Sequence, residues 1–387
     1  MSSGERARIL IVHSTLHIGG AEEVTANLCR HIDRSRFDVA VCYLKEEGMI
    51  GEKIAAEGTE VIGIPRSRRF KTDYFSSVGL RKILRKRGFQ LTHSHDVHAL
   101  ADTTLCRLTT SGVRMVHTFH YGRYPQRDKP FRTIESLCWR FIDRPVAVSR
   151  VQRDNIRQLY RIPNDRLSIV WNGVDRQVSG PAPEFIQRHK ERGTLIIGSI
   201  NTLIEQKGMF DLLEVAARLK QQGCRRHIFL IAGEGHLRAP LEAYRRELGL
   251  EREVEYLGWV KDAARVMMDH VDIFFQPSLW EAMSIVLLEA MASGRAIVAT
   301  RVGETPHVVD TGISALLTDA GDVATMTATL ARLLEDDGLR AHLGAAASDR
   351  YVQDFTARAM ANRYMSLYDD LLGRGSRSPT LRGIHHR

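Results

Sequence analysis

Short runs of apolar residues alternate with longer segments of helical periodicity along most of the chain. The first run, at 8–13, is followed by Gly19-Gly20 and then by a helical pattern from Ala21. A continuous apolar run of this length predicts a strand buried on both faces. Further strands are predicted at 38–44, 60–64, 113–118, 145–149 and 167–171, with helices at 76–87 and 151–160. Such alternation indicates a parallel sheet covered by helices.

A second series of the same kind follows a break in the pattern at 179–193. The break is rich in proline, glycine and charge, which is typical of an interdomain linker. Strands are predicted next at 194–199, 227–232, 253–257, 272–276 and 296–299. We therefore predict two doubly wound α/β domains at 1–178 and 194–354. A helix is predicted over 355–372 and a disordered tail over 373–387.

Composition agrees with a globular protein of two domains. Of the 387 residues, 43% are hydrophobic and 26% charged, which excludes fibrous and wholly disordered classes. The first apolar run is too short for a signal peptide or a membrane span, so we expect a cytoplasmic protein. Five scattered cysteines without a Cys-x-x-Cys pair predict reduced thiols, not disulfides or a zinc site.

The net charge of +9 is unevenly distributed. Residues 1–193 carry 33 Lys and Arg against 21 Asp and Glu, whereas 194–387 carry 22 against 25. A basic first half predicts an anionic partner such as a membrane surface. The runs at 66–71 and 81–87, joined by apolar residues, fit either a helix on an anionic bilayer or an ordinary solvated helix face. A second basic region comprises Arg123, Arg127, Lys129, Arg132, Arg140 and Arg144. Nucleic-acid binding is not expected, because no aromatic and basic motif is present.

The segment 277–294 contains two carboxylates separated by seven residues. If a strand ends at Gln276 and a helix begins near Ser284, Glu281 lies in the loop above the strand and Glu289 lies in the helix. Ligands of open α/β sheets gather at this edge. The two acids can therefore face one ligand.

Each part of this segment has a chemistry of its own. Glu281 can accept hydrogen bonds from sugar hydroxyls, and Glu289 from a ribose diol. Between them, the backbone N–H groups around Met283, Ser284 and Ile285 are suited to a diphosphate. The alternative interpretation is that Glu281 only caps the helix and Glu289 is solvated.

Two other loops carry candidate phosphate-binding groups. Gly19 and Gly20 allow the backbone to approach an oxyanion closely, just before a helix. Lys207 stands after one predicted strand and before a helix near Met209, where it can neutralise a leaving diphosphate. The alternative for Lys207 is a solvated surface lysine.

Histidines follow two of the predicted strands. His120 lies at the carboxyl end of a strand and can hydrogen-bond a sugar or orient an acceptor hydroxyl. His117 competes with it for this role. His93, His95 and His98 form either a metal site or the end of a strand that lines the acceptor side.

The segment 277–294 resembles the E-x7-E signature of the retaining GT-B glycosyltransferases, especially family 4. Other motifs are similar to the family and follow in its order. They are Gly19-Gly20-Ala21-Glu22, Asn172-Gly173-Val174-Asp175, Ala232-Gly233-Glu234-Gly235, Leu257-Gly258 and Val302-Gly303-Glu304. The resemblance covers about residues 8–370.

This resemblance implies a GT-B fold, in which two Rossmann-like domains face each other across a cleft and the C-terminal helix returns to the N-terminal domain. It implies metal-independent transfer with retention from a nucleotide-diphosphate sugar, a UDP-sugar or GDP-mannose. The implied acceptor is lipid-linked or a polysaccharide precursor. The implied catalytic residues are Glu281, His120 and Lys207. The implied donor-binding residues are Gly19, Gly20, Lys207, Gly258, Met283, Ser284, Ile285 and Glu289.

One position departs from the family pattern. The family usually has an arginine a few residues before the lysine, and Thr202 stands there. Loss of one cation should weaken stabilisation of the departing phosphate. The alternative function is therefore a catalytically inactive protein that binds a nucleotide sugar or a polyanion.

Overall fold

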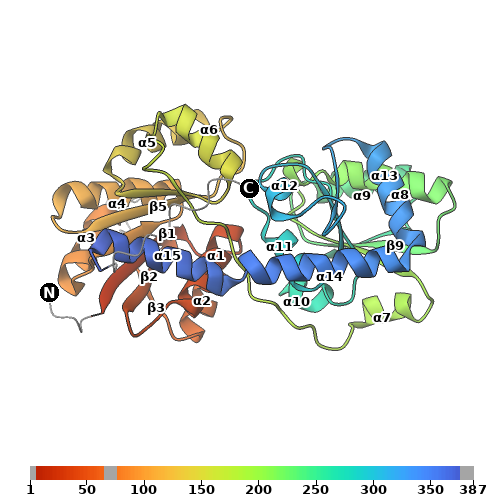
Figure 1. Cartoon of the computed structure of the whole chain (residues 1–387), viewed down its shortest axis with the longest axis horizontal. Coiled ribbons are helices and arrows are strands. Elements are labelled where there is room, and N and C mark those ends of the chain that lie inside the picture. Colours follow the sequence, from red (N-terminus) through yellow and green to blue (C-terminus); the bar gives the residue numbers. More distant parts are fainter. Residues whose placement is uncertain (1–5, 65–75, 375–387) are drawn as a thin grey trace. The chain divides into compact units, whose positions relative to one another are not determined.

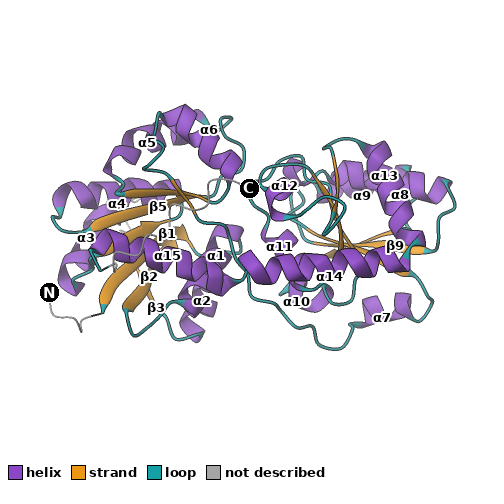
Figure 2. Cartoon of the chain, viewed as in Figure 1, coloured by secondary structure: helices purple, strands orange, loops and turns teal. Residues whose placement is uncertain are grey.

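The structure is a computed structural model that describes residues 6–64 and 76–374. The chain forms two compact units (Figure 1). Each unit contains one sheet of parallel strands with helices packed against it (Figure 2). Both are Rossmann-like, as the sequence predicts.

In the first unit, the strand order is β3-β2-β1-β4-β5-β6-β7. Its strands are β1 (Ala7–Thr15), β2 (Phe37–Glu46), β3 (Glu60–Gly63), β4 (Leu91–Ser94), β5 (Arg114–Phe119), β6 (Arg144–Ala147) and β7 (Ser168–Ile169). Its helices are α1 (Gly20–His31), α2 (Gly48–Ala56), α3 (Ser76–Arg87), α4 (Val97–Thr109), α5 (Lys129–Cys138), the short 3-10 helix η1 (Trp139–Phe141), α6 (Arg150–Tyr160) and α15 (Ala357–Leu372).

The centre of this sheet is buried on both faces. In β1, Ile9, Leu10, Ile11 and Val12 are fully buried, because β2 and β4 flank the strand and helices cover it. The order of the strands reverses between β1 and β4. At such a reversal, consecutive loops leave the carboxyl edge of the sheet in opposite directions, and ligands bind there.

The C-terminal helix α15 packs on the first unit. Figure 1 shows it in blue beside α1, which it contacts. Tyr364 and Tyr368 are fully buried. The hydroxyl of Tyr368 is hydrogen-bonded to His93 Nδ1 at 2.7 Å, and that of Tyr364 to Thr118 Oγ1 at 3.0 Å. The helix therefore belongs to the core of this unit.

In the second unit, the strand order is β10-β9-β8-β11-β12-β13. Its strands are β8 (Leu195–Ile200), β9 (His227–Ala232), β10 (Val254–Gly258), β11 (Ile273–Gln276), β12 (Ala296–Thr300) and β13 (Leu316–Thr318). Its helices are α7 (Glu184–Lys190), the 3-10 helix η2 (Glu205–Lys207), α8 (Met209–Gln221), α9 (Arg238–Glu247), α10 (Ala263–Met267), α11 (Ile285–Ala292), α12 (Thr305–Val308), α13 (Val323–Glu335) and α14 (Asp337–Asp354). The order reverses between β8 and β11.

The chain divides earlier than the predicted end of the first domain at residue 178. The N-terminal part of the first unit runs to Trp171, and α15 returns to this unit from Ala357. The second unit comprises Asn172–Thr356 together with the short segment Ser149–Gln152. The side-chain amide of Asn172 donates to the carbonyl of Met283 at 3.3 Å, and the N–H of Val174 donates to the carbonyl of Phe355 at 3.0 Å. The predicted linker at 179–193 contains α7, whose Arg188 forms an ion pair with Glu255.

The apolar side of α3 faces the core of the first unit. Leu80 and Leu84 are buried in a cluster with strand residues, and Ile83 packs against that cluster. Of the apolar residues of 76–87, only Val78 is exposed, so this arrangement favours the ordinary solvated helix face of the two interpretations. The run at 66–71 and most of the predicted tail, 375–387, lie outside the described residues. In the described ranges, no helix is long and apolar enough to cross a membrane.

Candidate active site

Two loops meet at the carboxyl edge of the second sheet, where the strand order reverses. The loop after β8 runs through η2 to α8, and the loop after β11 runs to α11. The N–H of Leu279 in the second loop donates to the carbonyl of Gln206 in the first at 2.7 Å. The predicted residues Lys207 and Glu281 stand one on each loop.

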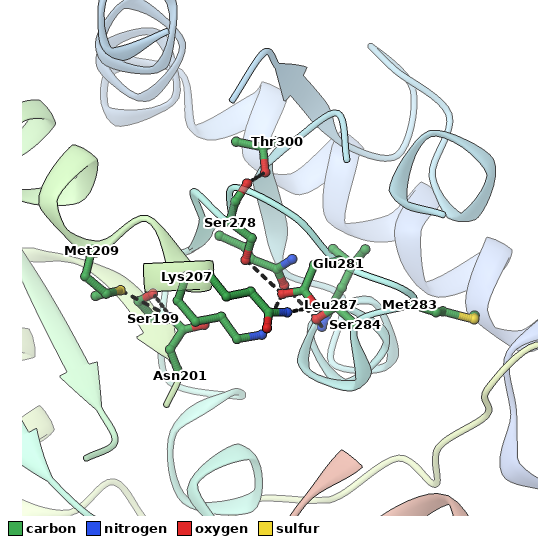
Figure 3. Close-up of polar contacts among 12 residues, drawn as sticks. Ser199, Asn201, Lys207, Met209, Ser278, Glu281, Met283, Ser284, Leu287 and Thr300 are labelled. Carbon is green, nitrogen blue, oxygen red and sulfur yellow. Dashed lines mark hydrogen bonds and ion pairs between the residues drawn. The ribbon is translucent and has the colours of Figure 1, made fainter. Parts of the chain in front are cut away.

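Glu281 is a buried carboxylate at this meeting point, with 7% of its surface exposed. Its Oε1 lies 2.5 Å from Lys207 Nζ and accepts a hydrogen bond from Ser278 Oγ at 2.9 Å. Its Oε2 accepts from Gln206 Nε2 at 3.1 Å. Figure 3 shows Lys207 and Ser278 directed at the carboxylate. A buried charge is costly unless it is paired and hydrogen-bonded, so these four side chains stabilise one another.

Gly208 allows the two loops to approach so closely. It has φ of +62°, and a Cβ on it would lie 2.0 Å from the carbonyl oxygen of Pro277. Gly303, with φ of +54°, lies against the other side of the loop, where its Cβ would be 2.1 Å from the carbonyl oxygen of Glu281. Only glycine adopts these conformations without strain or clash. These contacts hold Lys207 against Glu281.

The helix after this loop begins where the sequence predicts. Ser284 is the N-cap of α11, and its hydroxyl accepts from the N–H of Leu287 at 3.3 Å and donates to Gln276 Oε1 at 2.8 Å. The first N–H groups of a helix, here from Ile285 on, have no partner within the helix. They form the positive end of α11, which follows directly on the loop of Glu281.

Three other predicted donor-side residues lie outside the Glu281 cluster. The Sδ atom of Met283 lies 3.2 Å from the backbone nitrogen of Asn172, and its side chain is directed away from the cluster (Figure 3). Glu289 is half-buried in the second turn of α11. Gly258 ends β10 with φ of +71°, and its carbonyl accepts from the N–H of Gly233 at 2.7 Å.

The glycine pair of the first unit lies at the start of α1, where the sequence predicts it. Gly19 is the N-cap of α1 and has an extended backbone, which any residue can adopt. A Cβ on Gly19 would lie 2.3 Å from Oε2 of Glu22. The glycine therefore leaves room for a carboxyl group folded over the start of α1. Gly20 is the first residue of the helix and is exposed.

Histidines gather at the carboxyl edge of the first sheet, near the reversal between β1 and β4. The rings of His13 and His95 stack at 4.7 Å, and those of His95 and His120 at 5.2 Å. His95 Nδ1 is hydrogen-bonded to His120 Nε2 at 2.9 Å. The competing residue His117 is hydrogen-bonded to the hydroxyl of Ser94 at 2.9 Å and is buried. His120 is the more open of the two predicted histidines.

Burial sets the protonation of these rings. Loss of solvation lowers the pKa of His120 to about 3 and that of His13 to about 4, against a small opposing effect of Asp96. The same cause lowers the pKa of His117 to about 3. Burial raises the pKa of Glu22 to about 7. The histidines of this edge are therefore neutral at pH 7.

The segment His93–Asp96 forms the end of β4 and the start of the loop, as one of the two interpretations predicts. His93 uses both ring nitrogens, one on Tyr368 and one on Thr118 Oγ1 at 2.8 Å. The ring of His98 packs against Phe131. In the residues that the structure describes, no group of three or more His, Cys, Asp or Glu side chains could hold a metal ion.

Several residues that complete the site were not predicted from the sequence. Ser278 and Gln206 bond Glu281, and each is close to a predicted residue in the sequence, which is the signal that could have found them. Thr300 at the end of β12 donates to the carbonyl of Ser278 at 2.5 Å. Only the fold brings Thr300 to this loop. Thr202 is exposed, and its carbonyl accepts from the N–H of Ile204.

Comparison with known families defines the class of protein. Residues 18–178 match the model described as Glycosyltransferase Family 4, and residues 182–350 match the model described as Glycosyl transferases group 1. The chain belongs to the family 4 glycosyltransferases and is an enzyme of the GT-B fold.

Individual relatives agree with this assignment. The chain is 29% identical to EpsF of Bacillus subtilis (strain 168), which is named a glycosyltransferase, over 76% of this chain and 79% of that protein. It is 23% identical to the UDP-Gal:alpha-D-GlcNAc-diphosphoundecaprenol alpha-1,3-galactosyltransferase of Escherichia coli, over 95% and 98%. Among solved structures, Anabaena Alr3699/HepE in complex with UDP and glucose has a TM-score of 0.82 at 18% identity, with 94% of this chain and 100% of that chain covered.

Proposed function

We propose that this enzyme transfers a sugar, with retention at the anomeric carbon, from a nucleotide-diphosphate sugar to a lipid-linked or polysaccharide-precursor acceptor. A UDP-sugar is the expected donor and GDP-mannose the second candidate. The observation that carries the proposal is the contact of Glu281 with Lys207, Ser278 and Gln206 at the strand reversal of the second sheet. The names of the galactosyltransferase and of the HepE complex support a UDP-sugar.

The cluster offers the donor two complementary groups. The ammonium of Lys207 has three N–H bonds, and Glu281 uses one of them, so the others can reach phosphate oxygens. The N-terminus of α11 adds a second positive group close by in the chain. Together they stabilise the charge that develops on a departing diphosphate, which is the role of a metal ion in other transferases. Glu281 positions the sugar, and Glu289 the ribose.

His120 is proposed to hold the transferred sugar or the acceptor hydroxyl. It is neutral at pH 7, because burial lowers its pKa to about 3, and it follows the carboxyl end of β5. Gly19 and Gly20 start α1 at the same edge of the first sheet. Gly19 and Gly20 are the proposed donor-binding residues of this unit, and His120 is its proposed catalytic residue.

Replacement of Glu281 tests the assignment. We expect Glu281→Gln to lower the kcat for transfer from a UDP-sugar by about a hundredfold or more, because a charged group of a preorganised site is lost. Glu205→Gln is the matched control, since Glu205 stands in the same loop but is exposed and pairs with His236. Release of UDP, measured with UDP-glucose, UDP-galactose and GDP-mannose in turn, gives the rates. Equal rates for the two variants would contradict the role of Glu281.

Two further measurements separate the parts of the proposal. The anomeric configuration of the product, read by NMR, distinguishes retention from inversion. A thermal shift with a nucleotide sugar but no transfer or hydrolysis would favour the inactive binding protein, since a bound donor stabilises the folded state without any reaction. The thermal shift on its own identifies the nucleotide and the sugar that bind best.

We also propose that the first unit meets an anionic membrane, in agreement with a lipid-linked acceptor. Its exposed apolar side chains include Leu105 and Leu108 on α4, Leu137 on α5 and Phe141 on η1. Leu108 and Phe141 line a hollow of about 380 Å³. Its charged residues are Arg107, Arg140, Arg166 and one carboxylate, Asp143, which pairs with Arg107 at 3.8 Å. Apolar residues beside several cations are suited to a surface of anionic lipid headgroups.

A further inference from the structure

The ring of His120 uses one of its two nitrogens inside the protein. Its Nε2 is hydrogen-bonded to Nδ1 of His95 at 2.9 Å, with the two rings nearly parallel at 19°. His120 is only partly buried, whereas His95 is 2% exposed. The chemistry that His120 offers to a ligand therefore depends on its other nitrogen, Nδ1.

His95 is enclosed by aromatic rings on several sides. His13 stacks on it at 4.7 Å, and His93 lies at 4.1 Å. The second nitrogen of His95, Nε2, is buried and has no hydrogen-bond partner among the described residues. This unpartnered atom decides how the proton between His95 and His120 is placed.

Both rings are neutral over the physiological range of pH. Burial lowers the pKa of His95 well below its usual value, and the neighbouring His93, His13, His120 and His117 lower that pKa further. For His120, burial is again the main cause, and Asp96 opposes it. A neutral imidazole carries one N–H and one bare nitrogen. One of the two facing nitrogens must then donate its hydrogen, and the other must accept it.

Two arrangements of the protons satisfy this condition. If His120 donates from Nε2, the proton of His95 is on Nε2, where a buried N–H has no acceptor. If His95 donates from Nδ1, its Nε2 is a bare nitrogen, and His120 carries its proton on Nδ1. Buried N–H groups without an acceptor are rare and costly. The second arrangement is therefore favoured.

We propose that His95 is a positioning residue that fixes His120 with its Nδ1–H directed outward, so that His120 donates a hydrogen bond to a ligand oxygen and does not remove a proton. This inference rests on the proposed transferase function for its consequence in catalysis. The ligand oxygen belongs to a sugar hydroxyl or to a phosphate, both of which accept hydrogen bonds. As the acceptor oxygen bonds the anomeric carbon and the bond to the diphosphate breaks, the proton of the acceptor hydroxyl passes to an oxygen of the departing diphosphate.

A pair of amide variants tests the direction of the hydrogen bond. The side-chain N–H of asparagine stands near the position of histidine Nδ1, whereas that of glutamine stands near Nε2. We expect His95→Asn to keep at least about a third of the wild-type kcat, and His95→Gln to lose about tenfold, the effect of one neutral hydrogen bond. Circular dichroism and thermal unfolding of both variants check the fold. Equal losses in the two variants would overturn the positioning role.

The tautomer itself can be observed without any substrate. Nitrogen-15 and proton NMR of the resting protein, with His120 assigned through His120→Gln, shows which ring nitrogen carries the proton. We expect Nδ1 to be protonated from pH 5 to pH 8 in the wild type. Protonation at Nε2 would overturn the inference even if transfer occurs. Absence of transfer with Nδ1 protonated would instead contradict the proposed function and leave the tautomer established.

Discussion

The contact between Lys207 and Glu281 depends on residues that have no polar side chain. Gly208 lies directly after Lys207, and its missing Cβ leaves room for the carbonyl of Pro277. Gly303 supports the backbone of Glu281 in the same way. At the scale of single residues, these glycines fix the geometry on which the chemistry depends.

Replacement of Gly208 measures this effect. Both Gly208 and Gly223 have φ near +63°, but a Cβ on Gly223 would meet no atom within 4 Å. Each alanine variant should lose about 1 kcal/mol through backbone strain. Gly208→Ala should lose about 1–3 kcal/mol more, because its Cβ clashes with backbone. Urea denaturation gives both values, and equal values would contradict the close approach of the loops.

The buried histidines predict a loss of stability in acid. An unfolded histidine binds a proton near pH 6.5, but His13, with a pKa of about 4, and His117 and His120, with pKa values of about 3, do not when the protein is folded. As the pH falls below 6.5, each such histidine lowers the free energy of unfolding by about 1.4 kcal/mol per pH unit, until its folded pKa is reached.

Urea denaturation at pH 7, 6 and 5 measures this slope. Glu22 acts in the opposite direction: its raised pKa of about 7 means that its contribution is lost as the pH rises from 4.5 to 7. One carboxyl group opposes several histidines, so the net stability should still fall in acid. His117→Asn should reduce the slope. A stability that is constant from pH 7 to pH 5 would show that these rings are not buried neutral.

At the scale of elements, α15 belongs with strands that precede it by more than two hundred residues in the chain. The hydroxyl of Tyr368 bonds His93 in β4, and that of Tyr364 bonds Thr118 in β5. The last helix therefore supports the strands whose ends carry His95 and His120. Substitutions that destabilise α15 should therefore also disturb His95 and His120 at the carboxyl edge of the first sheet.

Removal of one hydroxyl group tests whether α15 stabilises these strands. Tyr368→Phe leaves Nδ1 of His93 buried without its partner and should lower stability by about 1–3 kcal/mol. Ser366→Ala on the same helix is the control, since its exposed hydroxyl bonds only the carbonyl of Asn362 one turn earlier. Thermal or urea unfolding compares the two variants with the wild type. A loss as small as that of the control would show that the bond to His93 contributes little.

At the scale of the whole molecule, charge is concentrated in the first half of the sequence. Leu80 and Leu84 of α3 are covered, so a membrane would meet the exposed apolar side chains of α4, α5 and η1 instead. Arg107, Arg140 and Arg166, which line the hollow beside Leu108 and Phe141, would then contact lipid headgroups. The first unit would be the part that receives a lipid-linked acceptor.

Sedimentation with lipid vesicles tests this surface. We expect the protein to sediment with phosphatidylglycerol vesicles and not with phosphatidylcholine vesicles. Arg140→Glu should weaken binding by about fivefold or more, since each basic residue contributes about 1 kcal/mol. Lys261→Glu in the second unit changes the net charge equally and should have little effect. Equal weakening by both variants would indicate attraction by net charge alone, without a defined surface.

The local sequence pattern was sufficient to predict most of the helices and strands. It also predicted the two candidate groups of the second unit, Lys207 and Glu281. The predicted helix at 76–87 and the strand end at Gln276 match the structure, because periodicity and caps are properties of a few neighbouring residues. Strand β13, of three residues, was not predicted, and β4, of four, was predicted only as one of two interpretations of its histidine-containing end, since so short an apolar run has no distinct period. The division near Trp171 was also missed, because distant contacts of Asn172 decide it.

The sequence by itself determined the class of fold, the family and the residue types of the site, because these depend on residues that are close together in the chain or stand in a fixed order. Only the tertiary structure decided that Lys207 pairs with Glu281, that the carboxyl group of Glu22 lies over Gly19, and that His95 is hydrogen-bonded to His120. The physical reason is that each of these relations is set by side-chain packing and hydrogen bonding in three dimensions. A linear pattern contains neither the direction of a side chain nor the loss of solvation that determines its charge.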